Sequence, residues 1–220
     1  MKKKDRLTAA HKWKWVKFTW DHAHFGDCWN TIVFTDEKKF NLVGNNGYYW
    51  VWVEGDEEVV LERDSNVKLS VMVWGAIAYG NKLQLVHVDH WMNAEKYIKM
   101  LDDYVIHVIQ AEMGEDAIFQ QDNAPCHQAH QTLAYLADQD LEVLDWPPKS
   151  PDLNPIENVS SILLTLGYMN GWTFLKKEDL WDAILDAWNR MDVNEVSNCI
   201  ESVHDRMLDV LAVGGERLKK

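Results

Sequence analysis

The hydrophobic pattern of this chain changes its period near residue 93. Before that point the apolar and β-branched residues gather in short runs of the kind that form strands. These runs are residues 31–36, 48–55, 69–79 and 82–89. Gly80-Asn81 joins the last two runs, and turns of this type connect neighbouring antiparallel strands. The first part of the chain therefore predicts an antiparallel meander.

After residue 93 the spacing of apolar residues becomes helical and alternates with strand-like runs. We expect helices at 93–112, 130–139, 155–166, 177–191 and 193–212, and strands at 117–122 and 141–148. Residues 1–24 mix basic and aromatic residues and favour one more helix. A meander followed by alternating strands and helices predicts an α/β fold with a mixed sheet flanked by helices. The ribonuclease-H-like fold has this order, and other α/β folds share parts of it.

Composition excludes several classes of protein. With 47% hydrophobic and 26% charged residues in 220, the chain matches an ordinary globular domain rather than a disordered one. No run of residues is long and apolar enough for a membrane span, and charged residues stand where a secretory signal would be apolar. We therefore expect no membrane partner and no secretion. The three cysteines include no C-x-x-C pair, which argues against a disulfide framework or a four-cysteine zinc site.

The distribution of charge bears on nucleic-acid binding. The chain carries 22 Lys and Arg against 35 Asp and Glu, a net charge of −13. An acidic surface repels phosphate, so this charge alone disfavours binding to nucleic acids. Positive charge gathers at the start, where residues 1–30 hold seven Lys or Arg and three Asp. Any affinity for DNA is therefore expected to be weak and to come from residues 1–17.

Three carboxylates occur where strands end or a helix begins. Asp36 ends the run 31–36, Asp122 ends 117–122, and Glu157 opens the helix expected at 155. Ligand sites of α/β sheets lie at such edges. Three converging carboxylates would suit Mg²⁺ or Mn²⁺, which prefer oxygen ligands, and a pair of such ions can catalyse reactions at a phosphodiester.

Each carboxylate also has a structural interpretation. Asp36 is followed by charged residues and fits a solvated strand end, and Asp122-Asn123 fits an ordinary turn. The segment Asn154-Pro155-Ile156-Glu157 has the pattern of a capping box with proline at the first helical position. A cap would account for Glu157 without catalysis.

Four sequence blocks resemble the catalytic domain of mariner-type transposases of the DDE superfamily. They are FTDEKKFNL (34–42), SVMVWGAI (70–77), QQDNAPCH (120–127) and DWPPKSPDLNPIEN (145–158). The 34 residues between Asp122 and Glu157 match the spacing of the branch whose third acid is Glu. The resemblance extends from about Leu7 to Gly215.

This resemblance implies a ribonuclease-H-like catalytic domain at 31–220, after a basic and aromatic helical lead-in at 1–30. Asp36, Asp122 and Glu157 would be the catalytic residues and the ligands of Mg²⁺ or Mn²⁺, with Asn123 and His127 close to them. The implied activity is phosphodiester hydrolysis and strand transfer in cut-and-paste transposition. The implied partner is double-stranded DNA, both transposon ends and target, in the nucleus, and a homodimer is compatible with the family.

Some features depart from the family pattern. Residues 64–69 lack the usual glycines, and residues 159–167 and 203–206 lack the usual basic stretch and Pro-Arg-like segment. The 30 residues before the first strand hold no helix-turn-helix module, so the chain resembles the catalytic half alone. These departures leave a second hypothesis, a catalytically silent domain of the same origin that acts through binding or protein contacts. A third, a different ribonuclease-H-like nuclease, is disfavoured by the transposase-like blocks.

A short zinc-like cluster also occurs in this part of the chain. Cys126, His127 and His130 lie together in the sequence but lack a fourth ligand, so a polar loop is the favoured interpretation.

Overall fold

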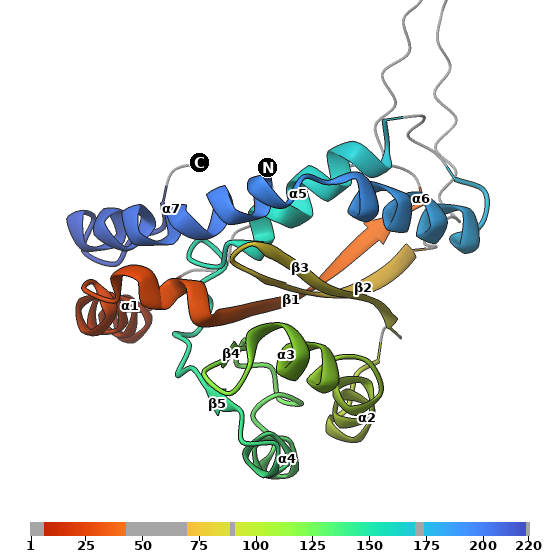
Figure 1. Ribbon diagram of the computed structural model, residues 1–220. Coiled ribbons are helices and arrows are strands. Elements are labelled where there is room, and N and C mark those ends of the chain that lie inside the picture. Colours follow the sequence, from red (N-terminus) through yellow and green to blue (C-terminus); the bar gives the residue numbers. More distant parts are fainter. Residues whose placement is uncertain (1–6, 43–69, 89–90, 170–173, 219–220) are drawn as a thin grey trace, which may run out of the picture.

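Five strands form one mixed sheet in the order β3-β2-β1-β4-β5 (Figure 1). The computed structural model describes residues 7–42, 70–88, 91–169 and 174–218. The strands are β1 (Ile32–Asn41), β2 (Ser70–Ala78), β3 (Asn81–Val88), β4 (Ile118–Gln120) and β5 (Glu142–Val143). β1, β2 and β3 pair antiparallel, whereas β4 is parallel to both β1 and β5. The mixed sheet predicted from the order of elements is confirmed, with β1, β2 and β3 antiparallel and β4 and β5 parallel.

Helices cover both faces of this sheet. They are α1 (Ala9–His22), the 3₁₀ helix η1 (Gly26–Thr31), α2 (Ala94–Tyr104), α3 (Ile106–Met113), α4 (His130–Asp138), α5 (Ile156–Gly167), α6 (Lys177–Arg190) and α7 (Val193–Ala212). Figure 1 shows α5, α6 and α7 on one face and α2, α3 and α4 on the other. The predicted helical spans at the C-terminal end agree with α5, α6 and α7 within about a residue.

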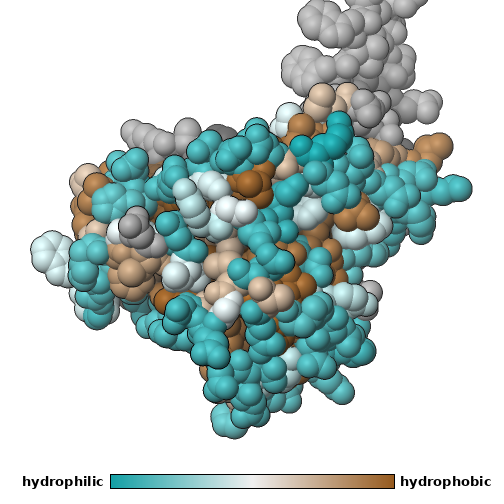
Figure 2. All heavy atoms as spheres, in the orientation of Figure 1, coloured by the Kyte–Doolittle hydropathy of each residue, from teal (hydrophilic) through white to brown (hydrophobic). Residues whose placement is uncertain are grey.

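Side chains alternate between two hydrophobic cores, as the pleat of a strand requires. On β1, Ile32, Phe34 and Phe40 belong to the core under α1, α5, α6 and α7. Val33 belongs to the core under α2, α3 and α4. Both faces of the sheet are thus buried, which explains why its strands read as nearly continuous apolar runs. The surface seen in Figure 2 is mostly hydrophilic, with hydrophobic patches between the helix layers.

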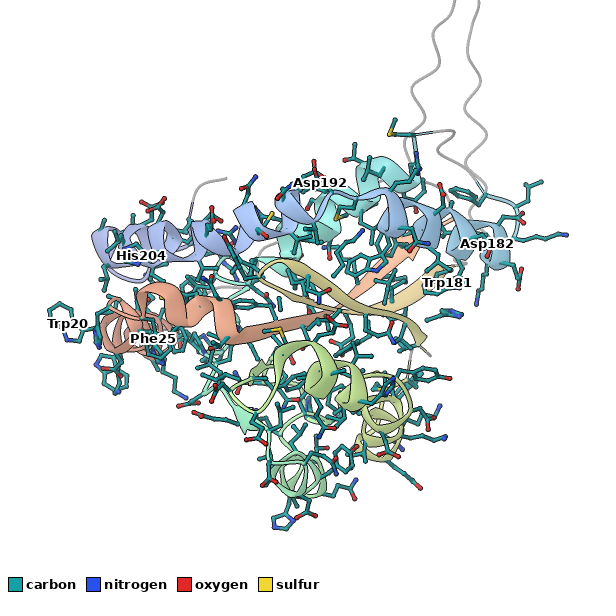
Figure 3. All side chains as sticks on the ribbon, in the orientation of Figure 1. Trp20, Phe25, Trp181, Asp182, Asp192 and His204 are labelled. Carbon is teal, nitrogen blue, oxygen red and sulfur yellow. The ribbon has the colours of Figure 1, made fainter. Side chains whose placement is uncertain are left out.

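Helix α1 is part of the first core. Trp15 is fully buried, and its indole Nε1 donates a hydrogen bond to the carbonyl oxygen of Pro148 at 2.8 Å. The ring of Phe18 packs edge-on against Trp146 at 5.3 Å. The opposite face of α1 exposes Trp13 and Trp20, at 62% and 72% of their surface, and Figure 3 shows Trp20 pointing away from the molecule. The domain boundary expected at residue 30 stays a prediction, although α1 packs in the same hydrophobic core as the elements that follow it.

Several predicted boundaries were wrong. The run 31–36 does not end at Asp36, because pairing with β2 carries β1 on to Asn41. The helix expected at 93–112 is two helices separated at Val105, where two β-branched residues in succession weaken the helix. The helix starts where it was expected, and the Asn93 side chain caps it by accepting a hydrogen bond from the Lys96 amide. The strand expected at 141–148 is only the two residues of β5.

Two other predictions cannot be compared with the structure. The strand expected at 48–55 and the glycine-poor segment 64–69 lie outside the described residues. Among the helices that are described, none combines the length and apolar character needed to cross a membrane.

Candidate active site

Asp36, Asp122 and Glu157 line one cavity of about 450 Å³. Asp36 lies within β1, Asp122 lies in the loop after β4, and Glu157 lies in the first turn of α5. The cavity is therefore formed where the parallel strands β1 and β4 separate and the N-terminal end of α5 approaches them. The remaining wall comes mainly from the loop 146–151, which α1 contacts through Trp15.

The register of the sheet explains why the two aspartates meet. The parallel pairing of β1 with β4 ends at Phe34 opposite Gln120. Asp36 and Asp122 each follow two residues later, so both lie at the same level just beyond the paired region. Residues two apart on a strand share a face, which places Asp36 on the face of the sheet that α5 covers. Asp36 therefore lies on β1, and Asp122 lies in the loop that follows the neighbouring strand β4.

The start of α5 lies against the sheet beside Asp36. Gly75 of β2 is the partner of Asp36 in the register, and Ile156, the first residue of α5, lies next to it. Asn154 connects this end of α5 to β1, since its Nδ2 donates to the carbonyl oxygen of Thr35 at 3.0 Å.

The structure does not show Glu157 acting as a helix cap. The N-cap residue of α5 is Pro155, without a side-chain capping bond, and Glu157 instead contacts β1. Its Oε2 accepts a hydrogen bond from Nζ of Lys38 at 2.7 Å. Lys38 is two residues beyond Asp36 and on the same face of β1, so this cation lies beside the carboxylates. The capping-box interpretation of Glu157 was therefore wrong.

Asp122 is held by its own loop. Its Oδ1 accepts a hydrogen bond from the Ala124 amide at 2.8 Å and lies 2.7 Å from Nδ1 of His127. Both contacts use Oδ1, and the side chain remains 55% exposed towards the cavity it lines. The turn interpretation of Asp122-Asn123 is thus compatible with a functional role for the same carboxylate.

Asn123 and His127 support the site from different sides. Nδ2 of Asn123 donates to the carbonyl oxygen of Trp146 at 2.8 Å, and Asn123 itself lines the cavity. His127 is almost fully buried behind Asp122, with its ring 4.2 Å from that of Tyr97. Its Nε2 lies 3.3 Å from Oε1 of Glu37. Both ring nitrogens therefore face carboxylates, which leaves neither for the zinc cluster considered from the sequence.

The carboxylates influence one another's ionisation. Burial, followed by repulsion from Glu157, Glu37 and Asp122, raises the pKa of Asp36 well above its usual value. Burial alone would also raise the pKa of Asp122, but its hydrogen bonds with His127 and the Ala124 amide outweigh burial and lower it. Mutual repulsion therefore contributes to the raised pKa of Asp36, although burial is the larger cause.

His127 carries a buried positive charge. Burial disfavours its charged form, but the contacts with Asp122 and Glu37 outweigh burial and raise the pKa of His127 to about 10. The imidazole is therefore protonated at neutral pH and lies between two carboxylates.

The oxygen atoms of these carboxylates are the type of ligand that a hard divalent cation prefers. Three carboxylates line the cavity, and burial together with their mutual repulsion raises the pKa of Asp36, a repulsion that a cation would compensate. Within the described ranges, however, no three His, Cys, Asp or Glu side chains already stand in a ligating arrangement. Cation binding would therefore draw the three carboxylates closer together, in competition with the contact between Glu157 and Lys38.

Four residues near the cavity were missed by the sequence analysis: Glu37, Lys38, Trp146 and Asn154. The period of two along β1 was a usable signal, because it places Lys38 with Asp36 and Glu37 on the opposite face. Nothing in the sequence indicates that Glu37 contacts His127, since the two residues are 90 positions apart.

The chain is similar in sequence to known proteins. A family described as "DDE superfamily endonuclease" matches residues 31–166. The Tc3 transposase of Caenorhabditis elegans is 36% identical over 211 residues, covering 95% of this chain and 63% of that protein. The Tc1 transposase of the same organism is 27% identical over 221 residues, covering 99% of this chain and 78% of that protein. The chain thus spans less than two thirds of the length of the Tc3 protein.

Solved structures with the same fold come from the Mos1 mariner transposase. Its catalytic domain superposes with a TM-score of 0.77 at 17% identity, covering 99% of this chain and all of that one. A pre-cleavage Mos1 transpososome superposes with a TM-score of 0.82 at 18% identity, covering 100% of this chain and 68% of that one. At these identities the likeness establishes the fold, and the predicted ribonuclease-H-like mixed sheet flanked by helices is confirmed.

Proposed function

This chain belongs to the DDE superfamily of endonucleases, and on that basis we propose that it is the catalytic domain of a cut-and-paste DNA transposase. In the first step a water oxygen bonds to the phosphorus at the end of the element, and the bond from phosphorus to the 3′ oxygen breaks. In the second step the freed 3′-hydroxyl attacks a phosphodiester of the target DNA and displaces its 3′ oxygen. The similarity to Tc3 and Tc1 transposases supports this choice of reaction.

One observation carries the proposal: the three carboxylates come from separate elements and line one cavity together. Asp36, Asp122 and Glu157 would hold Mg²⁺ or Mn²⁺ there. A divalent cation supplies charge compensation at the phosphate and lowers the pKa of a bound water. Among the Mos1 structures of this fold are complexes named with Mg and with Mn, which is consistent with either ion.

The surrounding side chains would keep these carboxylates in place. Asn123 fixes the loop after β4 to Trp146, and Asn154 fixes the start of α5 to β1 next to Asp36. Lys38 neutralises Glu157 as long as no cation is bound.

Double-stranded DNA, as transposon ends and target, is the proposed substrate, and a nuclear location follows from that substrate. The relatives include DNA-bound assemblies of Mos1, described as a paired-end complex and a transpososome. The net charge of −13 opposes tight binding by this chain alone. We therefore propose that this domain carries out the chemistry and contributes only a small share of the DNA affinity. We include a homodimer in this proposal.

The test is nicking of supercoiled DNA in the presence of Mn²⁺, with Asp36→Asn as the variant. Nicking should fall to background because a neutral amide is a poor ligand for a hard cation. Stability of the metal-free chain should hold or rise, since the fold disfavours the Asp36 carboxylate. This combination separates a catalytic role from a folding role.

Asp205→Asn is the matched control, because Asp205 is exposed on α7 and remote in sequence from the cavity. It should nick like the parent. If the folded parent neither binds Mn²⁺ nor nicks, the proposal fails and the catalytically silent alternative replaces it. The comparisons do not favour that alternative, and all three carboxylates are present in one cavity.

A further inference from the structure

Glu37 neighbours Asp36 in the sequence but faces the other side of the sheet. Its Oε1 is buried and lies 3.3 Å from Nε2 of His127. The contact is an ion pair without the alignment of a hydrogen bond, because neither atom has a hydrogen-bond partner among the described residues. On the other side of the ring, Nδ1 of His127 lies 2.7 Å from Oδ1 of Asp122. The imidazole thus bridges a carboxylate of β1 and a carboxylate of the loop after β4.

The ring of His127 is fixed by packing as well as by charge. It is buried against Tyr97, with ring centres 4.2 Å apart. The hydroxyl of Tyr97 donates to Oε1 of Gln121 at 3.0 Å, and Nε2 of Gln121 donates to the backbone carbonyl of His127 at 3.1 Å. The same buried network therefore holds both the ring and the backbone of His127.

Glu37 does not line the cavity that holds Asp36, Asp122 and Glu157. Among the described residues, its carboxylate contacts the site through His127, and its charge also adds to the repulsion that raises the pKa of Asp36. Because His127 contacts Oδ1 of Asp122, any shift of the ring changes the direction of the second oxygen, Oδ2. The side chain of Asp122 is otherwise half exposed, and among the described residues its other hydrogen-bond partner is the Ala124 amide.

We propose that Glu37 is a positioning residue that acts through the ring of His127 to orient the carboxylate of Asp122 towards the cavity. This inference rests on the proposed function, since it gives Asp122 a cation to bind. A ligating carboxylate usually has such supporting contacts, and loss of one typically lowers metal affinity or activity by about 10- to 100-fold. Glu37 is thus the outermost member of a chain of three residues that ends in the cavity.

The main test compares Glu37→Gln with the parent chain. Glutamine keeps the size and one acceptor oxygen but removes the charge that faces His127. We expect the ring ¹⁵N resonances of His127 to shift in the metal-free protein, and the affinity for Mn²⁺ to fall about 10- to 100-fold. In the nicking reaction kcat should fall while KM for DNA stays unchanged, because Glu37 does not line the cavity. Glu142→Gln, an exposed glutamate on β5, should match the parent in every measurement.

Glu37→Asp is a second variant, which keeps the charge but shortens the side chain by one methylene. It should shift the His127 resonances less than Glu37→Gln and lose less Mn²⁺ affinity. Unchanged His127 resonances, or parental Mn²⁺ affinity, in a folded Glu37→Gln protein would overturn the inference while leaving the proposed function intact. Absence of Mn²⁺ binding in the parent would instead overturn the proposed function, and the His127 resonances would still decide whether Glu37 holds the ring.

Discussion

Nζ of Lys38 lies 2.7 Å from Oε2 of Glu157, so the acid on α5 is neutralised by a cation from β1. Lys38 shares its face of β1 with Asp36, and the pair with Glu157 closes the gap between that strand and the helix. Both side chains are largely buried, at 30% and 22% exposure, so water screens the pair only in part. The metal-free site therefore contains a counterion from the protein itself.

Replacing Lys38 should reveal this compensation. In Lys38→Met the Glu157 carboxylate faces Asp36 without a counterion, and the metal-free protein should lose about 1.5–3 kcal/mol of stability, the scale of a charged hydrogen bond. Because no ammonium then competes for Glu157, Mn²⁺ should bind more tightly and should restore more stability than it adds to the parent. Urea unfolding with and without Mn²⁺ measures both effects. Lys39→Met, at an exposed position of the same strand, should change neither.

Glu157→Gln removes the charge of the other partner in this ion pair. The variant loses the pair with Lys38 but also the repulsion that contributes to the raised pKa of Asp36. Because these two effects oppose each other, stability of the metal-free chain should fall by less than the about 1.5–3 kcal/mol expected for Lys38→Met. Mn²⁺ binding and nicking should fall sharply. Parental Mn²⁺ affinity in this variant would remove Glu157 from the site.

The sequence predicted the elements whose signals are local. The spans of α5, α6 and α7 follow from their own apolar spacing. The strand-like runs 31–36 and 117–122 indicated β1 and β4, although neither strand ends at the predicted carboxylate. The ends of β1 and of β5 were predicted poorly, since each depends on how far a partner strand continues to pair.

The contacts of the candidate site could not be predicted for a related reason. Glu157 had a local explanation as a cap, and only the approach of α5 to β1 replaces that cap with Lys38. The bridge from Glu37 to Asp122 likewise depends on the loop after β4 folding back beneath the sheet. Such contacts join residues far apart in the chain, and their geometry is fixed by packing rather than by sequence spacing.

Stability should depend on pH through His127. The contacts with Asp122 and Glu37 raise its pKa to about 10, above the value of about 6.5 expected in the unfolded chain. A raised pKa means that the folded state binds the proton more tightly, so this stabilisation is complete below about pH 6.5 and is lost as the pH rises towards 10. Between pH 7 and 8.5 the free energy of unfolding should fall by at most about 1.4 kcal/mol per pH unit.

Urea unfolding across that pH range measures the slope. In His127→Gln the slope should be nearly absent, whereas His130→Gln, at an exposed position, should keep it. Equal slopes in the parent and in His127→Gln would show that His127 is not a buried cation.

DNA binding is expected to be weak and to depend on α1. The non-specific dissociation constant should be about 10⁻⁴–10⁻⁶ M or weaker at physiological salt. Deleting residues 1–17 is not a clean test, because it would remove Trp15 from the core and from Pro148. Reversing the charge of two lysines of α1, in Lys14→Glu with Lys17→Glu, leaves that packing in place.

Fluorescence anisotropy with a labelled duplex at several salt concentrations measures this effect. Each lost phosphate contact should reduce the slope of log affinity against log salt by about 0.9, so the double variant should lose up to about 1.8. Lys17 already pairs with Asp21, which makes Lys14 the larger contributor. Lys99→Glu, on the exposed side of α2, serves as the control and should keep the parental slope. An unchanged slope in the α1 variant would show that the DNA contact lies elsewhere on the chain. Nanomolar binding by the parent would contradict the proposal that this domain contributes only a small share of the DNA affinity.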